Sequence, residues 1–442
     1  MELPLATTYK HVHELLLQNN NEDAIPILRQ IIKAMPLFGE AHYNLGLALC
    51  KMDKDDEAIE VLNRAAELRP EDWQAHSVMA RCYGNKGEFG PCVAHLKEAL
   101  RIEPENKQTQ WKLSYYLLMQ GKFDEAAPYE EWWRTCGARA RIKTWYGHRP
   151  PGKTVFVYPD GGIGDSINYF RYCLLLPDIW GVDRVFVGCY SELREMFARA
   201  MPRANLIDFG PVASRNNGSE CILNWDIDVP ITDACAYQSD LFPIFGFKHH
   251  GETVPYITAD QKKVQEWGWK IKSQFGYDPN YLRIGVIWQG HTGANNDDKR
   301  SFPLSYFKPL DEIPGIRLYA LQAKYGLEQV ASSGVDLVNL GYQFDVNSME
   351  DMAAALEHMD LTISVCTGGA HVAGAMGKPV WLLLSKLACW RWLRDRSDTP
   401  FYPTMRLFRQ EYDNDWHKVI HSVCHELVEW RKDLWLSTQK GT

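Results

Sequence analysis

Apolar and small residues recur at a fixed spacing through the N-terminal third of the chain. Three prolines stand at equal intervals, at Pro36, Pro70 and Pro104. The same step relates four small residues, which are Ala24, Ala58, Cys92 and Ala126. A period of about 34 residues with apolar positions at helical spacing predicts stacked helical hairpins.

The residue sizes within one unit also suit a helical hairpin. We expect Leu45 and Gly46 to lie where two helices touch, and Ala58 and Ala65 where they pack closely. This pattern resembles the tetratricopeptide repeat family and predicts a solenoid over residues 1–140, with about three full repeats and a partial one. The resemblance implies a concave surface for a peptide or protein. A scaffold or dimerisation module is the alternative.

From Thr154 onward, short β-branched runs alternate with helical stretches, which predicts parallel α/β sheets. A first group of strands is expected at 154–159, 184–189, 205–210 and 220–225. A second group is expected at 282–288, 316–322, 335–340, 361–365 and 379–384. The aromatic stretches 130–133 and 145–146 are expected to seal the joint between the solenoid and these strands.

The fold class is therefore α plus α/β, with two Rossmann-like, doubly wound domains over 150–260 and 275–412 that face a cleft. Residues 413–442 are predicted to form a closing amphipathic helix. Its apolar stripe comprises Trp416, Ile420, Val423, Leu427 and Trp430.

Composition and charge narrow the class of protein. The 442 residues suit two or three domains, and 45% hydrophobic with 24% charged residues fits a soluble globular chain. A net charge of −8 gives no global field that would attract nucleic acid or anionic lipid. No signal peptide pattern or membrane-spanning stretch is evident, so we expect a cytoplasmic protein. Eleven cysteines without a C-x-x-C pair are expected to be mostly buried apolar residues.

Three loops that follow predicted strands carry candidate chemistry. Residues 160–166 (DGGIGDS) open a helix, and Gly162 and Gly164 would let a ligand approach the backbone. This turn lacks the third glycine of a dinucleotide fingerprint and the G-K-[ST] of a Walker loop. Asp165 suits a general base facing the cleft, and its alternative role is to cap the helix.

The second loop, 291–303, places Lys299 and Arg300 after a small-residue turn, which suits a diphosphate unless the loop is merely solvated. Gln289 precedes this loop, and Gln322 ends the next strand as a candidate nucleotide or ribose contact. The third loop, 365–371 (VCTGGAH), offers a hydroxyl and backbone N–H groups at a helix start, a ready anion site.

Together, G-I-G-D at 162–165, K-R-S-F-P at 299–303 and T-G-G-A-H at 367–371 with the following GKPVWLLL resemble the bacterial heptosyltransferase family, glycosyltransferase family 9, of the GT-B fold. The run from Trp390 to Gln410 is similar to the branch of that family fused to tetratricopeptide repeats. The resemblance implies sugar transfer from a nucleotide-sugar donor to an acceptor hydroxyl, by inverting displacement without a metal or other cofactor. A protein or glycan acceptor selected by the repeats and a homo-oligomer are the implied partners.

The resemblance also implies roles for individual residues. Asp165 would take the proton of the acceptor hydroxyl, and Lys299 and Arg300 would hold the donor's diphosphate. The pyrophosphate and sugar would meet Thr367, Gly368, Gly369 and His371. The family usually has Asp where this chain has Cys366, which favours the alternative of a catalytically inactive, glycosyltransferase-like scaffold or protein-binding module.

Other motifs are interpreted as structural. The D-x-D triplet at 226–228 is expected to be a polar strand edge rather than a metal site. His417, His421 and His425 share one helix face and could bind a transition metal, but a solvated stripe is the preferred interpretation. His249 and His250 form a pair without a third ligand in the nearby sequence.

Overall fold

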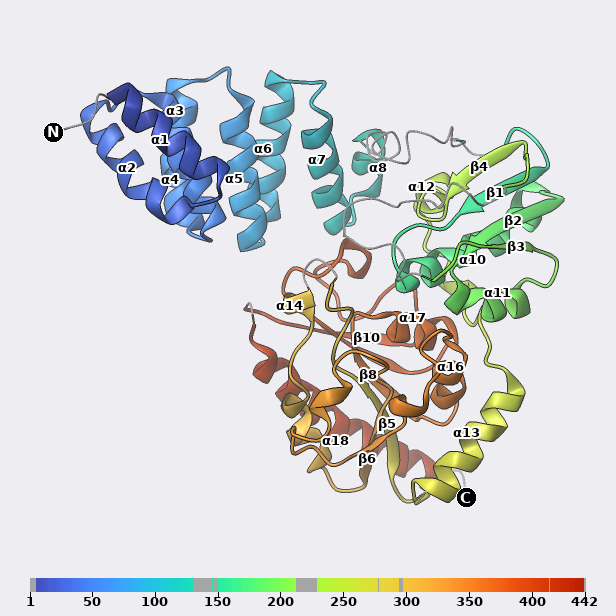
Figure 1. Cartoon of the computed structure of the whole chain (residues 1–442). Coiled ribbons are helices and arrows are strands. Elements are labelled where there is room, and N and C mark those ends of the chain that lie inside the picture. Colours follow the sequence, from blue (N-terminus) through green and yellow to red (C-terminus); the bar gives the residue numbers. More distant parts are fainter. Residues whose placement is uncertain are drawn as a thin grey trace. The chain divides into compact units, whose positions relative to one another are not determined.

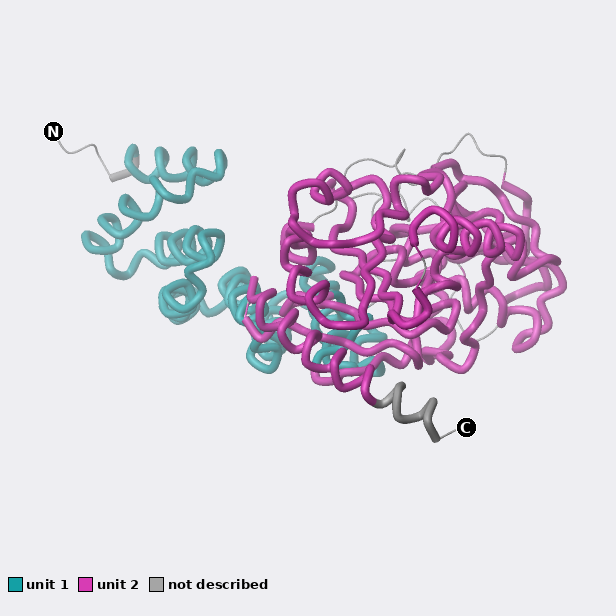
Figure 2. The backbone as a smooth tube through the Cα atoms, turned by 90° about the horizontal axis from the view of Figure 1, so that it is seen from below, with its two compact units in different colours: residues 1–135, 389–394 teal, residues 136–388, 395–442 magenta. Residues whose placement is uncertain are grey.

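The computed structural model describes residues 5–129, 145, 150–211, 229–276, 278–293, 297–412 and 414–440. They divide into two compact units (Figure 2), of which the first comprises Met1–Thr135 with Cys389–Arg394 and the second Cys136–Ala388 with Asp395–Thr442. The aromatic stretch 130–133 and Tyr146, the strand expected at 220–225 and the D-x-D triplet at 226–228 lie outside the described residues.

The first unit is a row of helices that pack as consecutive hairpins (Figure 1). They are α1 (Leu5–Leu17), α2 (Asn21–Ala34), α3 (Gly39–Lys51), α4 (Asp55–Leu68), α5 (Trp73–Lys86), α6 (Phe89–Ile102), α7 (Lys107–Met119) and α8 (Phe123–Ala126), followed by the 3-10 turn η1 (Ala127–Tyr129). The first helices of successive hairpins start at residues 5, 39, 73 and 107, and the second helices at 21, 55, 89 and 123. The repeat period predicted from the sequence is thereby confirmed in the helix boundaries.

Small residues set the close packing inside a hairpin, as predicted. A Cβ atom added to Gly46 of α3 would strike Cγ of Leu62 on α4. Ala58 and Ala65 are 0% and 1% exposed in the same interface. Leu62 can pack directly on the backbone of α3 here because Gly46 has no side chain.

A short segment from late in the chain belongs to this first unit. It contains the 3-10 turn η9 (Trp390–Trp392), which contacts α7. Nη1 of Arg394 donates to the carbonyl oxygen of Gly87 at 2.7 Å, and its guanidinium lies 4.6 Å from the ring centre of Phe89. The solenoid is therefore not built only from contiguous sequence, which the repeat pattern did not predict.

The second unit contains two parallel sheets. The first has the order β3-β2-β1-β4, with β1 (Thr154–Tyr158), β2 (Arg184–Cys189), β3 (Asn205–Asp208) and β4 (Ala234–Tyr237). Between these strands lie α10 (Ile163–Trp180), η3 (Ser191–Leu193) and α11 (Arg194–Ala200). After β4 come α12 (Leu241–Ile244), η5 (Gly251–Thr253) and α13 (Gln261–Gln274). The sequence pattern missed β4, an edge strand of this sheet, and also β10 (Met405–Arg409), an edge strand of the second sheet.

The second sheet has six strands in the order β10-β9-β8-β5-β6-β7. These are β5 (Leu282–Ile287), β6 (Ile316–Ala320), β7 (Leu337–Asn339), β8 (Leu361–Val365), β9 (Val380–Leu384) and β10 (Met405–Arg409). The helical elements between them are α14 (Asp297–Arg300), η6 (Leu304–Phe307), α15 (Lys308–Asp311), η7 (Leu327–Gln329), η8 (Gly341–Gln343), α16 (Glu350–Leu356) and α17 (Gly368–Ala375). β8 and β9 are buried along their whole length, as expected for the centre of a parallel sheet covered on both faces.

The chain closes with the long helix α18 (Trp416–Lys440). Its predicted apolar stripe is confirmed, because Trp416, Ile420, Val423 and Leu427 are buried in the core of the second sheet and Trp430 packs against that core. Among the helices that the structure describes, none combines the length and apolar character needed to cross a membrane.

Candidate functional site

The glycine turn after β1 is shaped by its own hydrogen bonds. Gly161 adopts a left-handed backbone with φ of +69°, which glycine tolerates best. The hydroxyl of Tyr190 donates to the carbonyl oxygen of Gly161 at 2.6 Å. Oδ2 of Asp165 accepts from the backbone N–H of Gly162 at 2.9 Å. Asp165 therefore caps α10 from the third helical position, while its role as a base stays a prediction.

The turn after β8 begins the short helix α17. Thr367 is the N-terminal cap residue, and its hydroxyl lies 3.3 Å from that of Ser364. Cys366, Thr367 and Gly368 are half-buried, whereas Gly369 is buried. His371 is only 2% exposed, and its Nδ1 lies 2.8 Å from the hydroxyl of Tyr402. The predicted sugar contact of His371 would have to be made from a buried position.

These two turns meet, although they are far apart in the sequence. A Cβ atom added to Gly164 would lie 2.6 Å from Cδ2 of His371, so the imidazole covers the backbone of Gly164. A Cβ atom added to Gly368 would lie 2.9 Å from Cγ2 of Ile163. Helices α10 and α17, which start at these turns, pack against each other. The acidic turn and the small-residue turn thus form one locus at the carboxyl ends of the two sheets.

The loop after β5 holds the predicted cations. Nε of Arg300 lies 3.0 Å from Oδ1 of Asp297, whose side chain is 8% exposed. The Arg300 guanidinium also lies against Gly290, where an added Cβ would be 2.6 Å from Nη2. Lys299 is exposed. Arg300 is therefore oriented toward the end of β5 by a buried carboxylate, and Lys299 faces solvent.

A cavity of about 520 Å³ opens beside this loop. Most of the residues that line it carry polar side chains, among them Gln289, Asp298, Ser301, Ser305 and Gln329. Nε2 of Gln329 donates to Oε1 of Gln289 at 2.8 Å. Hydroxyl, carboxylate and amide groups of this kind can form hydrogen bonds with a bound ligand.

The side chain of Gln322 makes hydrogen bonds to backbone, and its nucleotide or ribose contact stays a prediction. Its side chain is 3% exposed and its Oε1 accepts from the backbone N–H groups of Trp288 and Gln289, at 3.1 and 3.0 Å. Its Nε2 donates to the carbonyl oxygen of Gln289 at 2.9 Å. The amide thus fixes the end of β5 from β6, and the structure assigns Gln322 a positioning role at that strand end.

One residue that supports the locus was not assigned a role from the sequence. Arg171 of α10 is 0% exposed, and its guanidinium donates to the carbonyl oxygens of Asn168 and Phe401, at 2.9 and 2.6 Å. It also lies 4.8 Å from the ring centre of Tyr402, whose pKa is raised well above its usual value by burial. Arg171 is the only charged residue in the stretch INYFRYCLLL, and a lone charge among buried apolar residues is the sequence signal that could have identified it.

The remaining candidate motifs lie elsewhere. His417, His421 and His425 are on the exposed face of α18, and the ring of His417 stacks on Tyr306 at 4.4 Å. His249 packs on Phe401 with ring centres 4.6 Å apart. Across the described residues, the side chains that gather as metal ligands are instead Cys50, Asp55 and Cys82 in the solenoid.

Comparison with known proteins identifies the first unit. Residues 15–82 match the family model of the tetratricopeptide repeat. Over 435 residues, the chain is 24% identical to Protein FlbA of Caulobacter vibrioides, an alignment that covers 92% of this chain and 70% of that protein. The N-terminal helices are therefore tetratricopeptide repeats, and they precede a unit of parallel sheets and helices.

Similar solved structures align with only part of this chain. MamA from Desulfovibrio magneticus RS-1 is 18% identical with a TM-score of 0.29, over 30% of this chain and 78% of that chain. The Yersinia enterocolitica type III secretion translocator chaperone SycD is 17% identical with a TM-score of 0.25, over 26% of this chain and 92% of that chain.

Proposed function

We propose that this chain is a GT-B glycosyltransferase of the family 9 type, which transfers a sugar from a nucleotide-sugar donor to an acceptor hydroxyl. The observation that supports this proposal most is the contact between Gly164 and His371, which joins an acidic turn to a small-residue helix start at the carboxyl ends of two parallel sheets. Ligands of such sheets bind at this edge.

In this proposal Asp165 is the general base. Its carboxylate takes the proton of the acceptor hydroxyl while that oxygen attacks the anomeric carbon of the donor and the bond to the nucleoside diphosphate breaks. The hydrogen bond from Gly162 to Oδ2 supports this role, because it limits the rotation of the carboxylate before the acceptor arrives.

The departing diphosphate acquires charge that must be balanced. Arg300 would provide a cation already oriented by Asp297, and Lys299 an exposed cation next to it. The backbone N–H groups at the start of α17, after Thr367, would donate to phosphate oxygens. The cavity beside Gln289 would accept the base or ribose.

The repeats would bind a protein, either as the acceptor or as a partner that delivers it. Tetratricopeptide repeats present extended surfaces that suit protein segments. This assignment rests on the confirmed repeat fold of the first unit.

Donor binding tests the proposal first. The full chain is screened by thermal denaturation against a panel of nucleotide sugars, and one class should stabilise it by about 2.7 kcal/mol at a hundredfold excess over Kd. Arg300→Ala should weaken that binding by about 10- to 100-fold, since a hydrogen bond to a charged group contributes about 1.5–3 kcal/mol. Arg317→Ala, which removes a surface ion pair with Asp336, is the matched control.

Turnover tests the base. Asp165→Asn should reduce release of nucleoside diphosphate by about 10²- to 10⁴-fold. Asp183→Asn, at a carboxylate that is 62% exposed, should leave turnover unchanged. Full activity of the Asp165 variant would remove this residue from the mechanism.

An inactive scaffold is the second candidate, and Cys366 is the observation that favours it. A half-buried thiol stands where the resembled family usually has a carboxylate. Cys366→Asp distinguishes the two. Turnover in the natural chain supports the enzyme, whereas turnover that appears only in the Cys366→Asp variant supports a protein that has lost catalysis.

A further inference from the structure

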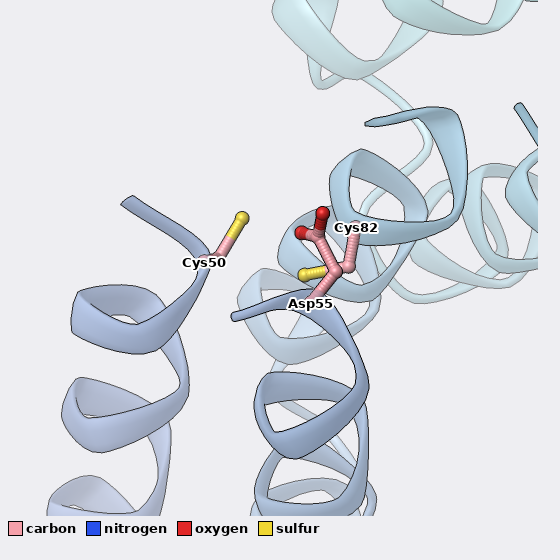
Figure 3. A group of neighbouring side chains, drawn as sticks. All are labelled: Cys50, Asp55 and Cys82. Atoms are coloured by element: carbon pink, nitrogen blue, oxygen red, sulfur yellow. The ribbon is translucent and has the colours of Figure 1, made fainter. Parts of the chain in front are cut away.

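Two cysteines and an aspartate converge between successive repeats of the solenoid (Figure 3). Cys50 is near the end of α3, Asp55 is the first residue of α4, and Cys82 lies on α5. One ligand atom from each of the three residues lies within 4.8 Å of the other two. Both cysteines are 0% exposed, while Asp55 is half-buried, so the cluster is closed on the sulfur side and reachable from the carboxylate side.

The carboxylate is held in place by a residue of the next repeat. Nδ2 of Asn85 on α5 donates to Oδ1 of Asp55 at 3.1 Å. Metal-ligating carboxylates are commonly hydrogen-bonded in this way, which fixes their orientation and tunes their affinity. The hydrogen bond from Asn85, which links α5 to α4, thereby also fixes the orientation of Oδ2 of Asp55.

The local electrostatics also suit a cation. Cys50 lies in the last turn of α3, where the partial negative charge of the helix end favours positive charge. Both sulfurs would lose their protons when a cation binds.

We propose that Cys50, Asp55 and Cys82 form a binding site for a thiophilic divalent cation, and that Zn²⁺ is the ion it fits best. Two sulfurs and one carboxylate oxygen are a ligand set that Zn²⁺ accepts, at about 2.3 Å for sulfur and about 2.0–2.2 Å for oxygen. Separations within 4.8 Å need only a small contraction to reach the edges of such a tetrahedron. Water would take the fourth position, on the side of half-buried Asp55.

A bound ion would connect α3, α4 and α5, and so two consecutive repeats. Its binding releases the two thiol protons to solvent and forms two metal–sulfur bonds and one metal–oxygen bond. A disulfide is the competing chemistry of two adjacent thiols. The carboxylate favours the cation instead, because it supplies a third ligand atom and a negative charge that stabilises a metal ion beside the sulfurs.

Cobalt substitution tests this site in the full-length chain. The reduced, metal-free protein is titrated with Co²⁺, and we expect a thiolate-to-cobalt charge-transfer band that saturates at one equivalent and disappears when Zn²⁺ is added. Cys50→Ser should abolish the band. Cys92→Ser removes another thiol of the solenoid that is also 0% exposed, and it should leave the band unchanged.

Two variants that retain both cysteines test the site independently if Cys50→Ser disturbs folding. Asn85→Ala leaves all three ligands in place and should weaken Zn²⁺ binding by about 10- to 100-fold in competition with a chromophoric chelator. Asp55→Asn should weaken it at least as much. The proposal is overturned if no charge-transfer band forms, if the band persists in Cys50→Ser, or if Cys50 and Cys82 form a disulfide on mild oxidation in a chain that takes up no metal.

Discussion

Nη1 of Arg171 lies 2.6 Å from the carbonyl oxygen of Phe401, and both groups are buried. This hydrogen bond joins α10, which follows the first strand of one sheet, to the segment that leads into the last strand of the other. The next residue, Tyr402, contacts His371, which in turn covers Gly164 at the start of α10. Arg171 therefore belongs to neither turn, but it holds the segment at Phe401 and Tyr402 that positions His371.

Replacing Arg171 with lysine should destabilise the second unit. Lysine cannot reproduce the planar set of donors, so the carbonyl oxygen of Phe401 and the side-chain oxygen of Asn168 lose partners in a buried environment. We expect the free energy of unfolding to fall by about 2–4 kcal/mol, since each unsatisfied buried group costs about 1–3 kcal/mol. Denaturant titration measures the loss, and Arg317→Lys, with its surface ion pair, should change little.

Gly164→Ala tests the contact between the two turns. The new methyl group would lie 2.6 Å from Cδ2 of His371, whose ring is held by Tyr402, so we expect a loss of about 1–3 kcal/mol from overpacking. Gly162→Ala is the control in the same turn, because its added Cβ meets only Oδ2 of Asp165, at 3.8 Å. Equal thermal midpoints for the two variants would contradict the described contact.

The close approach inside the solenoid can be tested in the same manner. Gly46→Ala should lower stability by about 1–3 kcal/mol because its methyl group would strike the side chain of Leu62. Gly90→Ala, at an exposed helical position with nothing within 4 Å, should instead be neutral or gain up to about 1 kcal/mol from helix propensity. Circular dichroism during denaturation separates these opposite signs.

Stability should depend on pH through His249. Burial, followed by repulsion from Arg171 and Arg396, lowers the pKa of His249 from 6.5 to about 4. The unfolded chain therefore takes up a proton as the pH falls below 6.5, while the folded chain remains neutral at this ring until about pH 4. This contribution to stability is complete above pH 6.5 and is lost progressively down to about pH 4.

His249→Phe should reduce that pH dependence, because phenylalanine keeps the ring contact with Phe401 and cannot titrate. The measurement is the urea midpoint of both proteins from neutral pH down to the folded-state pKa. His417→Gln, on the exposed face of α18, serves as the control and should follow the natural chain. Parallel curves for the His249 variant and the natural chain would refute the assignment.

Local periodicity located much of the fold. The repeat step placed the helices of the solenoid, and the β-branched runs placed β1, β2 and β8 almost at their observed bounds. The pattern missed the edge strands β4 and β10, although it located the equally short edge strands β3 and β7. Gln322 was correctly placed at a strand end, but only its bonds to Trp288 and Gln289 revealed that it holds backbone.

The helices of the solenoid, most of the strands and the buried face of α18 could be inferred from the chain alone, because they follow from contacts among residues that are close in sequence. The covering of Gly164 by His371, the bond from Arg171 to Phe401 and the proximity of Cys50, Asp55 and Cys82 became visible only in the folded molecule. These contacts join residues from different elements. Their geometry is set by how whole helices and sheets pack, which no local pattern of residue types encodes.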